Sequence, residues 1–255
     1  MPTASVNGVD LAYVREGDGP RLLLLNGSGS TMAATGLLRR PLAESFEVLT
    51  FDARGIGEST IPAEPFTMDD CANDAIALLD HVGWDSCRLI GISFGGMVAQ
   101  HVAIAAPDRV ERLALLCTSP GGEGGSSFPL HEQVPTPTVL DTRFTPEWLA
   151  EHPGDAALVD FMAKRAAVPK DDETVRGEQA QLVARSHHDA WDRLDRITAP
   201  TLVAGGRYDG LAPFANSEAI ASRIAGSELR GYEGGHAFFI QDPLAFPDVI
   251  AFLRS

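Results

Sequence analysis

The stretch Leu89-Ile90-Gly91-Ile92-Ser93-Phe94-Gly95-Gly96 decides the fold. The residues from Cys87 onward have the composition of a buried strand, and residues 97–105 have that of a packed helix. The pattern Gly-x-Ser-x-Gly between them predicts a sharp turn from strand to helix, in which glycines replace side chains that would not fit. The helix would then direct free N–H groups and its positive dipole end toward Ser93. The stretch therefore predicts a nucleophilic serine, and the alternative is a structural turn with a surface serine.

The rest of the chain alternates predicted strands with predicted helices. Residues 6–16 alternate apolar and polar side chains around Asn7-Gly8, which predicts an antiparallel edge hairpin. The other predicted strands are 21–25, 47–51, 87–90, 110–116, 200–204 and 228–232, and the predicted helices are 31–42, 66–82, 94–106, 214–224 and 243–253. This alternation predicts an α/β fold with a mostly parallel, eight-stranded sheet and helices on both faces. In such sheets the chemistry lies at the carboxyl ends of the strands.

The alternation is interrupted after the strand at 110–116. A glycine-rich linker at 120–127 and prolines at 129, 135 and 137 predict irregular structure, and three helices follow at 145–152, 155–167 and 170–185. We therefore expect residues 119–189 to form an inserted helical cap, or lid, on a core domain made of residues 1–118 and 190–255.

Two kinds of cap side chain are candidates for substrate contact. The aromatic ones predict an apolar pocket roof, although aromatic residues at helical spacing also form cores. These aromatic residues are Phe128, Phe144, Trp148 and Phe161. The cationic candidates for binding one carboxylate are Lys164, Arg165, Arg176 and Arg185, which are too dispersed to demand a polyanionic substrate.

Composition excludes several classes of partner and site. The formal net charge of −15 would repel nucleic acid and anionic membrane surfaces. Cys71, Cys87 and Cys117 are widely spaced in apolar surroundings, which predicts core residues of a reduced protein and no disulfide or metal site. The sequence shows no signal peptide and no apolar run of the ~20 residues that span a bilayer. We expect a cytoplasmic protein without a metal or cofactor. The sequence leaves open whether the protein forms a homodimer.

Two turn-rich loops follow predicted strands near the amino terminus. The loop Asn26-Gly27-Ser28-Gly29-Ser30-Thr31 lacks the lysine of a P-loop and a complete G-x-G-x-x-G, so donation of N–H groups to an oxyanion is the better interpretation. In the next loop, Asp52 and Arg54 could be catalytic, but we favour an ion pair that holds the loop. Thr67, with Asp70 three residues later, is predicted to cap the helix that follows.

A serine nucleophile needs a base, and the base needs a carboxylate. His236 is the best candidate base because it follows the last predicted strand in a glycine-rich loop. Asp209 follows the preceding strand and is the candidate acid, although it could instead cap the next helix. The order Ser93, Asp209, His236 is that of α/β-hydrolases. A rival acid position, after the strand ending at Leu116, carries no carboxylate.

From about residue 20 to the end, the chain resembles α/β-hydrolase fold enzymes, in the branch of 3-oxoadipate enol-lactonases, small carboxylesterases and cofactor-free haloperoxidases. The motifs that carry the resemblance are residues 52–59, residues 91–97, the loop around Asp209, and Gly235-His236. The resemblance implies an oxyanion hole formed by the N–H groups of Ser28 and Phe94. The chain departs from the family in one place, because Asn26-Gly27 stands where many members have His-Gly.

The resemblance implies a serine hydrolase that cleaves a small-molecule ester or lactone through an acyl-enzyme. Serine at the elbow excludes the haloalkane dehalogenases and epoxide hydrolases of this fold, which use aspartate there. C–C bond hydrolysis, thioester hydrolysis and perhydrolase or haloperoxidase chemistry remain alternatives, since each can use the same three residues. A ligand-binding receptor of this fold with little turnover is a further alternative.

Overall fold

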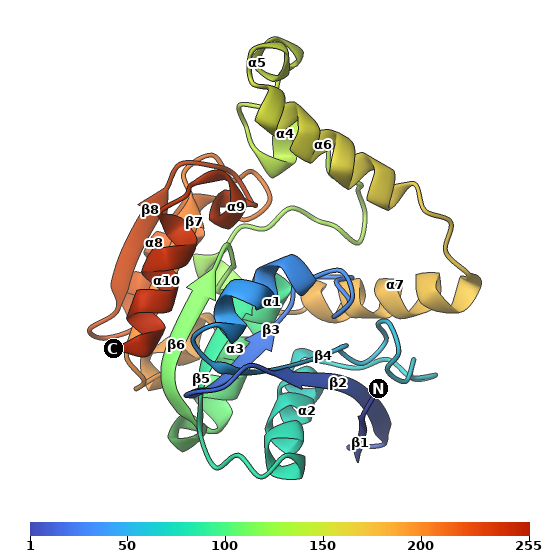
Figure 1. Ribbon diagram of the computed structural model, residues 1–255, viewed down its shortest axis with the longest axis vertical. Helices are drawn as coiled ribbons and strands as arrows, with labels where there is room; N and C mark the ends of the chain where they lie inside the picture. The colour runs from blue at the N-terminus through green and yellow to red at the C-terminus, as the bar shows by residue number, and fades with distance from the viewer.

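The computed structural model describes residues 1–255 and contains an eight-stranded sheet flanked by helices (Figure 1). The strands are β1 (Thr3–Val6), β2 (Val9–Glu16), β3 (Arg21–Leu25), β4 (Glu47–Phe51), β5 (Cys87–Ile92), β6 (Val110–Leu116), β7 (Thr201–Gly206) and β8 (Glu228–Tyr232). Their order across the sheet is β1-β2-β4-β3-β5-β6-β7-β8. β2 pairs antiparallel with β1 and β4, and all other pairs are parallel. The predicted α/β fold is confirmed.

The helices around the sheet are α1 (Gly36–Ala43), α2 (Met68–His81), α3 (Phe94–Ala105), α8 (Phe214–Arg223), α9 (Phe238–Gln241) and α10 (Ala245–Arg254). The helix predicted at 31–42 begins only at Gly36, because residues 31–35 form successive turns. The sequence analysis missed α9, whose four residues are too few to produce a helical pattern. The predicted cap of α2 is confirmed, since Thr67 and Asp70 each accept the other's backbone N–H.

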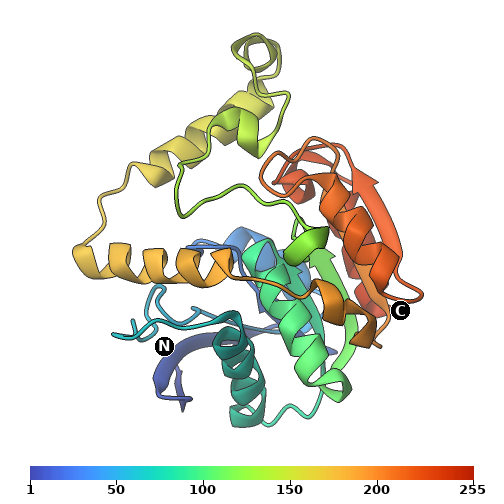
Figure 2. The ribbon, with the colours of Figure 1, turned by 180° about the vertical axis from the view of Figure 1, so that it is seen from behind.

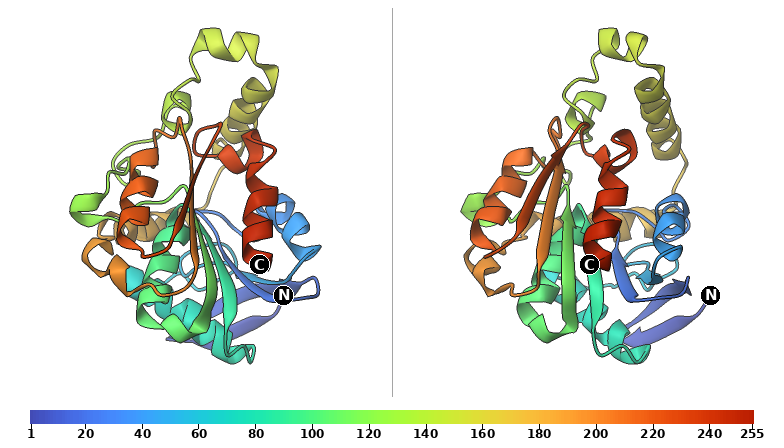
Figure 3. Two further views of the ribbon diagram at one scale, coloured as in Figure 1. Left: turned by 90° about the vertical axis from the view of Figure 1, so that its left-hand side faces the viewer. Right: turned by 60° about the vertical axis from the view of Figure 1, so that its left-hand side comes forward.

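Side chains of the central strands point alternately into two apolar cores. In β3, Leu23 belongs to one core and Leu24 to the other, as the two-residue period of a strand requires. The first core also contains apolar residues of α2, α3 and α8, and the second contains residues of α1 and α10. The helices therefore lie on both faces of the sheet (Figure 3). None of the helices combines the length and apolar character needed to span a bilayer.

The segment between β6 and β7, residues 119–189, carries four helices and is called the cap segment below. These helices are α4 (Pro137–Leu140), α5 (Pro146–Glu151), α6 (Pro153–Ala166) and α7 (Asp172–Ser186). α5 and α6 extend away from the sheet, whereas α7 lies along the core (Figures 1 and 3). α7 packs closely there, since a Cβ on its Gly177 would lie 2.0 Å from the carbonyl oxygen of Gly55. The prolines at 129, 135 and 137 predicted irregular structure, but the residues from Pro137 to Leu140 form the short helix α4.

The predicted ion pair between Asp52 and Arg54 is wrong. The Asp52 carboxylate instead accepts backbone N–H groups from Met32 (2.6 Å) and Glu58 (3.0 Å), which holds the loop from within. Arg54 crosses to α2, where its Nε and Nη2 each donate to Asp74 at 2.6 Å. Tertiary packing brings α2 beside the loop, so no local sequence pattern marks this partner.

The ion pair between Arg54 and Asp74 is almost completely buried, with side-chain exposures of 8% and 1%. Burial by itself lowers the pKa of Arg54, but the hydrogen bonds and charge of Asp74 outweigh it and raise that pKa. The guanidinium therefore depends on its partner to remain stable in the interior.

We expect Asp74→Asn to destabilise the fold by about 3–5 kcal/mol, because it leaves a buried guanidinium without a counter-charge. The free energy of unfolding, measured in urea, checks this. Asp80→Asn is the matched control on α2. Asp80 pairs with Arg109 but is 67% exposed, so its loss should change stability by less than about 1 kcal/mol. Equal effects of the two substitutions would contradict the stabilising role of the buried pair.

Candidate active site

Ser93 lies in a strained backbone conformation between β5 and α3. Its φ of 55° and ψ of −115° fall outside the regions that residues with side chains favour. A Cβ on Gly91 would lie 2.4 Å from the Gly95 carbonyl oxygen, and one on Gly95 would lie 2.1 Å from the Leu25 carbonyl oxygen. The two glycines therefore permit β3, β5 and α3 to approach closely enough to form the elbow, residues 91–95.

The end of β6 holds Ser93 in this conformation. The Ser93 N–H donates to the Leu116 carbonyl (2.8 Å), and the Thr118 hydroxyl donates to the Ser93 carbonyl (2.8 Å). Cys117 lies between them, and burial, with a smaller effect of the Asp209 charge, raises the pKa of its thiol well above the usual value. This strand end therefore contributes support for the serine and no reactive group. The sequence analysis assigned no role to Thr118.

The predicted nucleophile, base and acid lie along one chain of hydrogen bonds. His236 Nε2 is 3.0 Å from Ser93 Oγ, and His236 Nδ1 is 2.8 Å from Asp209 Oδ2. Asp209 is buried, and its Oδ1 accepts the N–H groups of Leu211 and Ala212, both at 2.8 Å. Because the carboxylate is fixed in this way, it can hold the imidazole with Nδ1–H toward itself and Nε2 toward the serine hydroxyl.

The cap segment holds the loop that carries the base. The His236 N–H donates to the Leu140 carbonyl at 2.6 Å, and Gln241 Nε2 donates to Asp141 Oδ2 at 3.0 Å. On the acid loop, the Tyr208 carbonyl accepts the N–H of Thr142 at 2.8 Å. Residues 140–142 thus bind both the loop of the acid and the loop of the base. No pattern in the sequence indicated this role.

Two backbone N–H groups next to Ser93 have no partner in the protein. They belong to Ser28 and Phe94, the residues expected to form an oxyanion hole. Ser28 lies in the oxyanion turn, residues 27–30, whose last N–H donates to its first carbonyl at 3.1 Å. In this turn only Gly29 has a positive φ, 62°, which is the type II pattern. A Cβ added at residue 27 would lie 3.7 Å from the Cβ of Ser93, so the turn packs against the serine.

Gln181 of α7 holds the oxyanion turn from the cap side. It is buried, and its Oε1 accepts the N–H of Gly29 at 2.8 Å.

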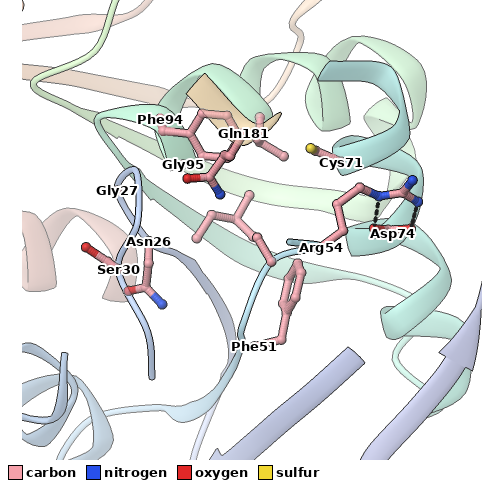
Figure 4. A pocket seen from close by; sticks show the side chains of 13 residues that line it. Asn26, Gly27, Ser30, Phe51, Arg54, Cys71, Asp74, Phe94, Gly95 and Gln181 are labelled. Atoms are coloured by element: carbon pink, nitrogen blue, oxygen red, sulfur yellow. Dashed lines mark hydrogen bonds and ion pairs between the residues drawn. The ribbon is translucent and has the colours of Figure 1, made fainter. Parts of the chain in front are cut away.

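A small cavity of about 20 Å³, with room for about one water, lies between the turn, α2 and α3. Figure 4 shows Asn26 and Gln181 on its wall, with Arg54 and Asp74 at its far end. Asn26 Nδ2 donates to Thr50 Oγ1 at 3.0 Å, so the asparagine holds the end of β3 in place.

The structure does not bring the four cap aromatic residues together as a pocket roof. Phe128 lines a polar cavity beside α3, whereas Phe144 is buried. Trp148 stacks on His152 with ring centroids 3.7 Å apart, and Phe161 is 59% exposed. Because α5 and α6 extend away from the sheet, the aromatic side chains of these helices pack within the cap segment or face solvent.

Comparisons with known proteins agree with this geometry. The chain matches the family model for the alpha/beta hydrolase fold over residues 20–151, just over half of its length. It is 27% identical over 252 residues to 3-oxoadipate enol-lactonase 2 of Acinetobacter baylyi, covering 96% of this chain and 92% of the relative. It is 28% identical over 252 residues to the poly(3-hydroxyalkanoate) depolymerase of Ectopseudomonas oleovorans, covering 92% of this chain and 84% of the relative.

A solved structure shows the same similarity in three dimensions. The crystal structure of the enol-lactonase from Burkholderia xenovorans superposes with a TM-score of 0.80 at 26% sequence identity, covering 100% of both chains. The family resemblance inferred from the motifs is therefore confirmed. The chain belongs to the α/β-hydrolase fold family, and it is an enzyme of the hydrolase type.

Proposed function

We propose that this protein is a serine hydrolase that cleaves a small carboxylic ester or lactone through an acyl-enzyme. The observation that carries the proposal is the unbroken hydrogen-bond chain from Ser93 Oγ through His236 to Asp209, at a strained elbow. The enol-lactonases among the similar proteins support a lactone or ester as substrate. The expected partner of this site is a small-molecule ester or lactone.

In the acylation step, His236 Nε2 accepts the hydroxyl proton as Ser93 Oγ attacks the carbonyl carbon. The electron pair of the carbonyl π bond moves to its oxygen, which then accepts hydrogen bonds from the N–H groups of Ser28 and Phe94. Each such donor contributes about 3–4 kcal/mol to stabilising the transition state. Asp209 stabilises the imidazolium that forms. Collapse of the intermediate breaks the bond to the leaving oxygen, and His236 gives that oxygen the proton.

In the deacylation step, water replaces the serine hydroxyl as the nucleophile. His236 takes a proton from the water, whose oxygen attacks the acyl carbon while the same two N–H groups bind the oxyanion. Cleavage of the acyl bond returns the proton to Ser93 Oγ and releases the carboxylic acid. The strained backbone of Ser93 holds Oγ beside His236 Nε2, 3.0 Å away.

The same first step would serve thioester hydrolysis, C–C bond hydrolysis or perhydrolysis, in which peroxide replaces water. Comparing turnover of esters, thioesters, C–C substrates and peroxide with a carboxylic acid separates these chemistries. We further propose that residues 119–189 act as a lid on the core formed by residues 1–118 and 190–255. Leu140 and Gln181 of this segment accept hydrogen bonds from the base loop and the oxyanion turn, which supports its assignment as a lid beside the site.

Ser93→Ala should lower kcat/KM for p-nitrophenyl esters by roughly 10⁴-fold or more, because it removes the nucleophile. Ester hydrolysis across acyl lengths and labelling by a fluorophosphonate measure this directly. Ser222→Ala, on the exposed face of α8, is the control for the effect of replacing a serine away from the site, and it should retain wild-type activity. Undiminished hydrolysis by Ser93→Ala, in protein free of host esterases, would overturn the proposed function.

Asp209→Asn should lower kcat by roughly 10⁴-fold with little change in stability, because an amide favours the wrong tautomer of His236. The matched control is Asp242→Asn, since Asp242 lies near the base loop but accepts backbone N–H groups from Glu233 and Leu244. We expect this control to retain activity within about tenfold of wild type, in line with the modest net contribution of a single hydrogen bond. Similar losses of kcat in both variants would contradict the assignment of Asp209 as the carboxylate that orients His236.

Ser28→Pro should lower kcat by about 10²–10³-fold relative to Ser28→Ala, because it removes one oxyanion donor. Proline is favoured at the second position of a type II turn, so the substitution keeps the shape of the oxyanion turn. Ser28→Ala removes the hydroxyl and keeps the N–H, so the difference between the two variants isolates the contribution of the N–H. Steady-state kinetics on one ester measures the ratio, and equal rates for the two variants would assign the oxyanion to other donors.

A further inference from the structure

A polar cavity of about 210 Å³, called the Arg185 cavity below, lies beside α3. It is enclosed by the first residues of the cap segment and the carboxyl end of α7, which come together in Figure 2. Its walls include Met97, Ser119, Phe128, His131 and Arg185, and no aspartate or glutamate lines it. The volume suits a small polar group with a short chain.

Arg185 is a buried guanidinium without a counter-charge. It is 6% exposed, and its only hydrogen bond runs from Nη1 to the Phe128 carbonyl at 3.0 Å. Its Nε is buried and has no partner. Burial lowers the pKa of Arg185, and no neighbouring carboxylate offsets this effect. A buried guanidinium without a counter-charge is unfavourable, and a bound anion would stabilise it.

Two other arginines show what the unpartnered edge of Arg185 is suited to bind. Arg54 uses its Nε and Nη2 to hold the carboxylate of Asp74, with both distances 2.6 Å. Arg143 uses the same edge on Asp141, at 2.9 and 2.7 Å. In Arg185 that edge makes no hydrogen bond, while Nη1 on the opposite side is anchored. The anchored guanidinium is preorganised for a bidentate carboxylate.

Two histidines also line the Arg185 cavity. His131 Nδ1 is buried without a hydrogen-bond partner, and its Nε2 is 3.2 Å from Glu132. His188 Nε2 donates to the Ser119 carbonyl at 2.9 Å. Burial, reinforced by His101, lowers the pKa of His188 to about 3, so that ring adds no charge. Arg185 is therefore the dominant charge of the cavity.

The walls of the Arg185 cavity adjoin the nucleophile. Met97 lies one helical turn after Ser93, and its N–H donates to the Ser93 carbonyl at 3.1 Å. Ser119 follows Thr118, whose hydroxyl donates to that same carbonyl. Two residues of the cavity wall therefore adjoin the backbone of Ser93.

The other cationic side chains of the cap segment lack these features. Lys164 pairs with Asp160 and is 75% exposed, and Arg176 pairs with Glu173. Arg165 is exposed on α6. Of the four candidates from the sequence, Arg185 alone is both buried and without an acidic partner.

We propose that the Arg185 cavity binds a carboxylate of the substrate, so that the enzyme prefers an ester or lactone whose acyl part ends in a carboxylate. This inference rests on the proposed function for its catalytic part. The carboxylate lies against the guanidinium of Arg185, which lines the cavity, and the rest of the acyl chain extends toward Ser93. Because the whole protein is strongly acidic, the preference for an anion arises from this cavity and not from the overall charge.

The first test compares p-nitrophenyl monoesters of succinate, glutarate and adipate with neutral esters of matching length. Wild type should favour the carboxylate-ended ester by at least about tenfold in kcat/KM at one length, as expected for a charge-assisted bidentate contact. Arg185→Gln should abolish this preference, mainly through KM, and change the neutral ester by less than about threefold. Arg165→Gln removes the same charge at an exposed position and should keep the preference.

Two further variants keep the test decisive if Arg185→Gln does not fold. Ser127→Asp adds a carboxylate at the exposed rim of the cavity, and Ser127→Asn is its uncharged match. The aspartate variant should lose the preference for the carboxylate-ended ester, while the asparagine variant should keep it. Retention of the preference in both would overturn the proposal.

Calorimetry with free glutarate tests the site without any turnover. Binding to wild type that disappears in Arg185→Gln, together with competition against the neutral ester, supports the proposal even if the ester chemistry is reassigned. Glutarate that binds through Arg185 without competing would overturn the assignment to substrate and indicate a separate ligand. No binding, or equal binding to both proteins, would overturn the site itself.

Discussion

The close approach of three backbone segments at the elbow is the constraint on which the rest of the site depends. β3 and β6 pair with β5 on either side, so their carboxyl ends meet where α3 begins. Gly91 and Gly95 leave no room for a Cβ there, and Ser93 is held in its strained conformation by Leu116 and Thr118. Such strain persists because the surrounding packing leaves the serine no alternative. The Ser93 hydroxyl therefore lies 3.0 Å from His236 Nε2 and beside the turn formed by residues 27–30.

The cap segment is joined by hydrogen bonds to two loops beside Ser93. Leu140 binds the backbone of the base loop, and Gln181 binds the oxyanion turn. These contacts come from opposite ends of the cap segment, while α5 and α6 between them extend away from the sheet (Figure 1). A movement of the cap segment would therefore be transmitted to the proton acceptor and to the oxyanion donors together. These hydrogen bonds link the position of the cap segment to the geometry of the candidate site.

The arginines Arg54, Arg143 and Arg185 differ in what their guanidinium groups hold. Arg54 and Arg143 each hold a carboxylate of the chain itself through the same two nitrogen atoms. Arg185 is anchored through Nη1, its Nε has no partner, and the residue lines a cavity without acidic side chains. In a chain with 35 acidic and 20 basic residues, an arginine without an acidic partner cannot be ascribed to a shortage of carboxylates. The exception among the buried arginines is what points to a substrate.

The sequence by itself determined the fold class, the elbow and the order of the three candidate catalytic residues. Each of these rests on a local pattern: strand and helix periodicity, glycines at fixed offsets from Ser93, and polar residues directly after strands. It did not determine the partner of Arg54, the supporting roles of Thr118 and Gln181, or the difference between Arg185 and Arg165. It also misplaced Phe161 and Trp148, which face solvent or pack within the cap segment. These features depend on contacts between segments far apart in the chain, and such contacts exist only once tertiary packing has brought the segments together.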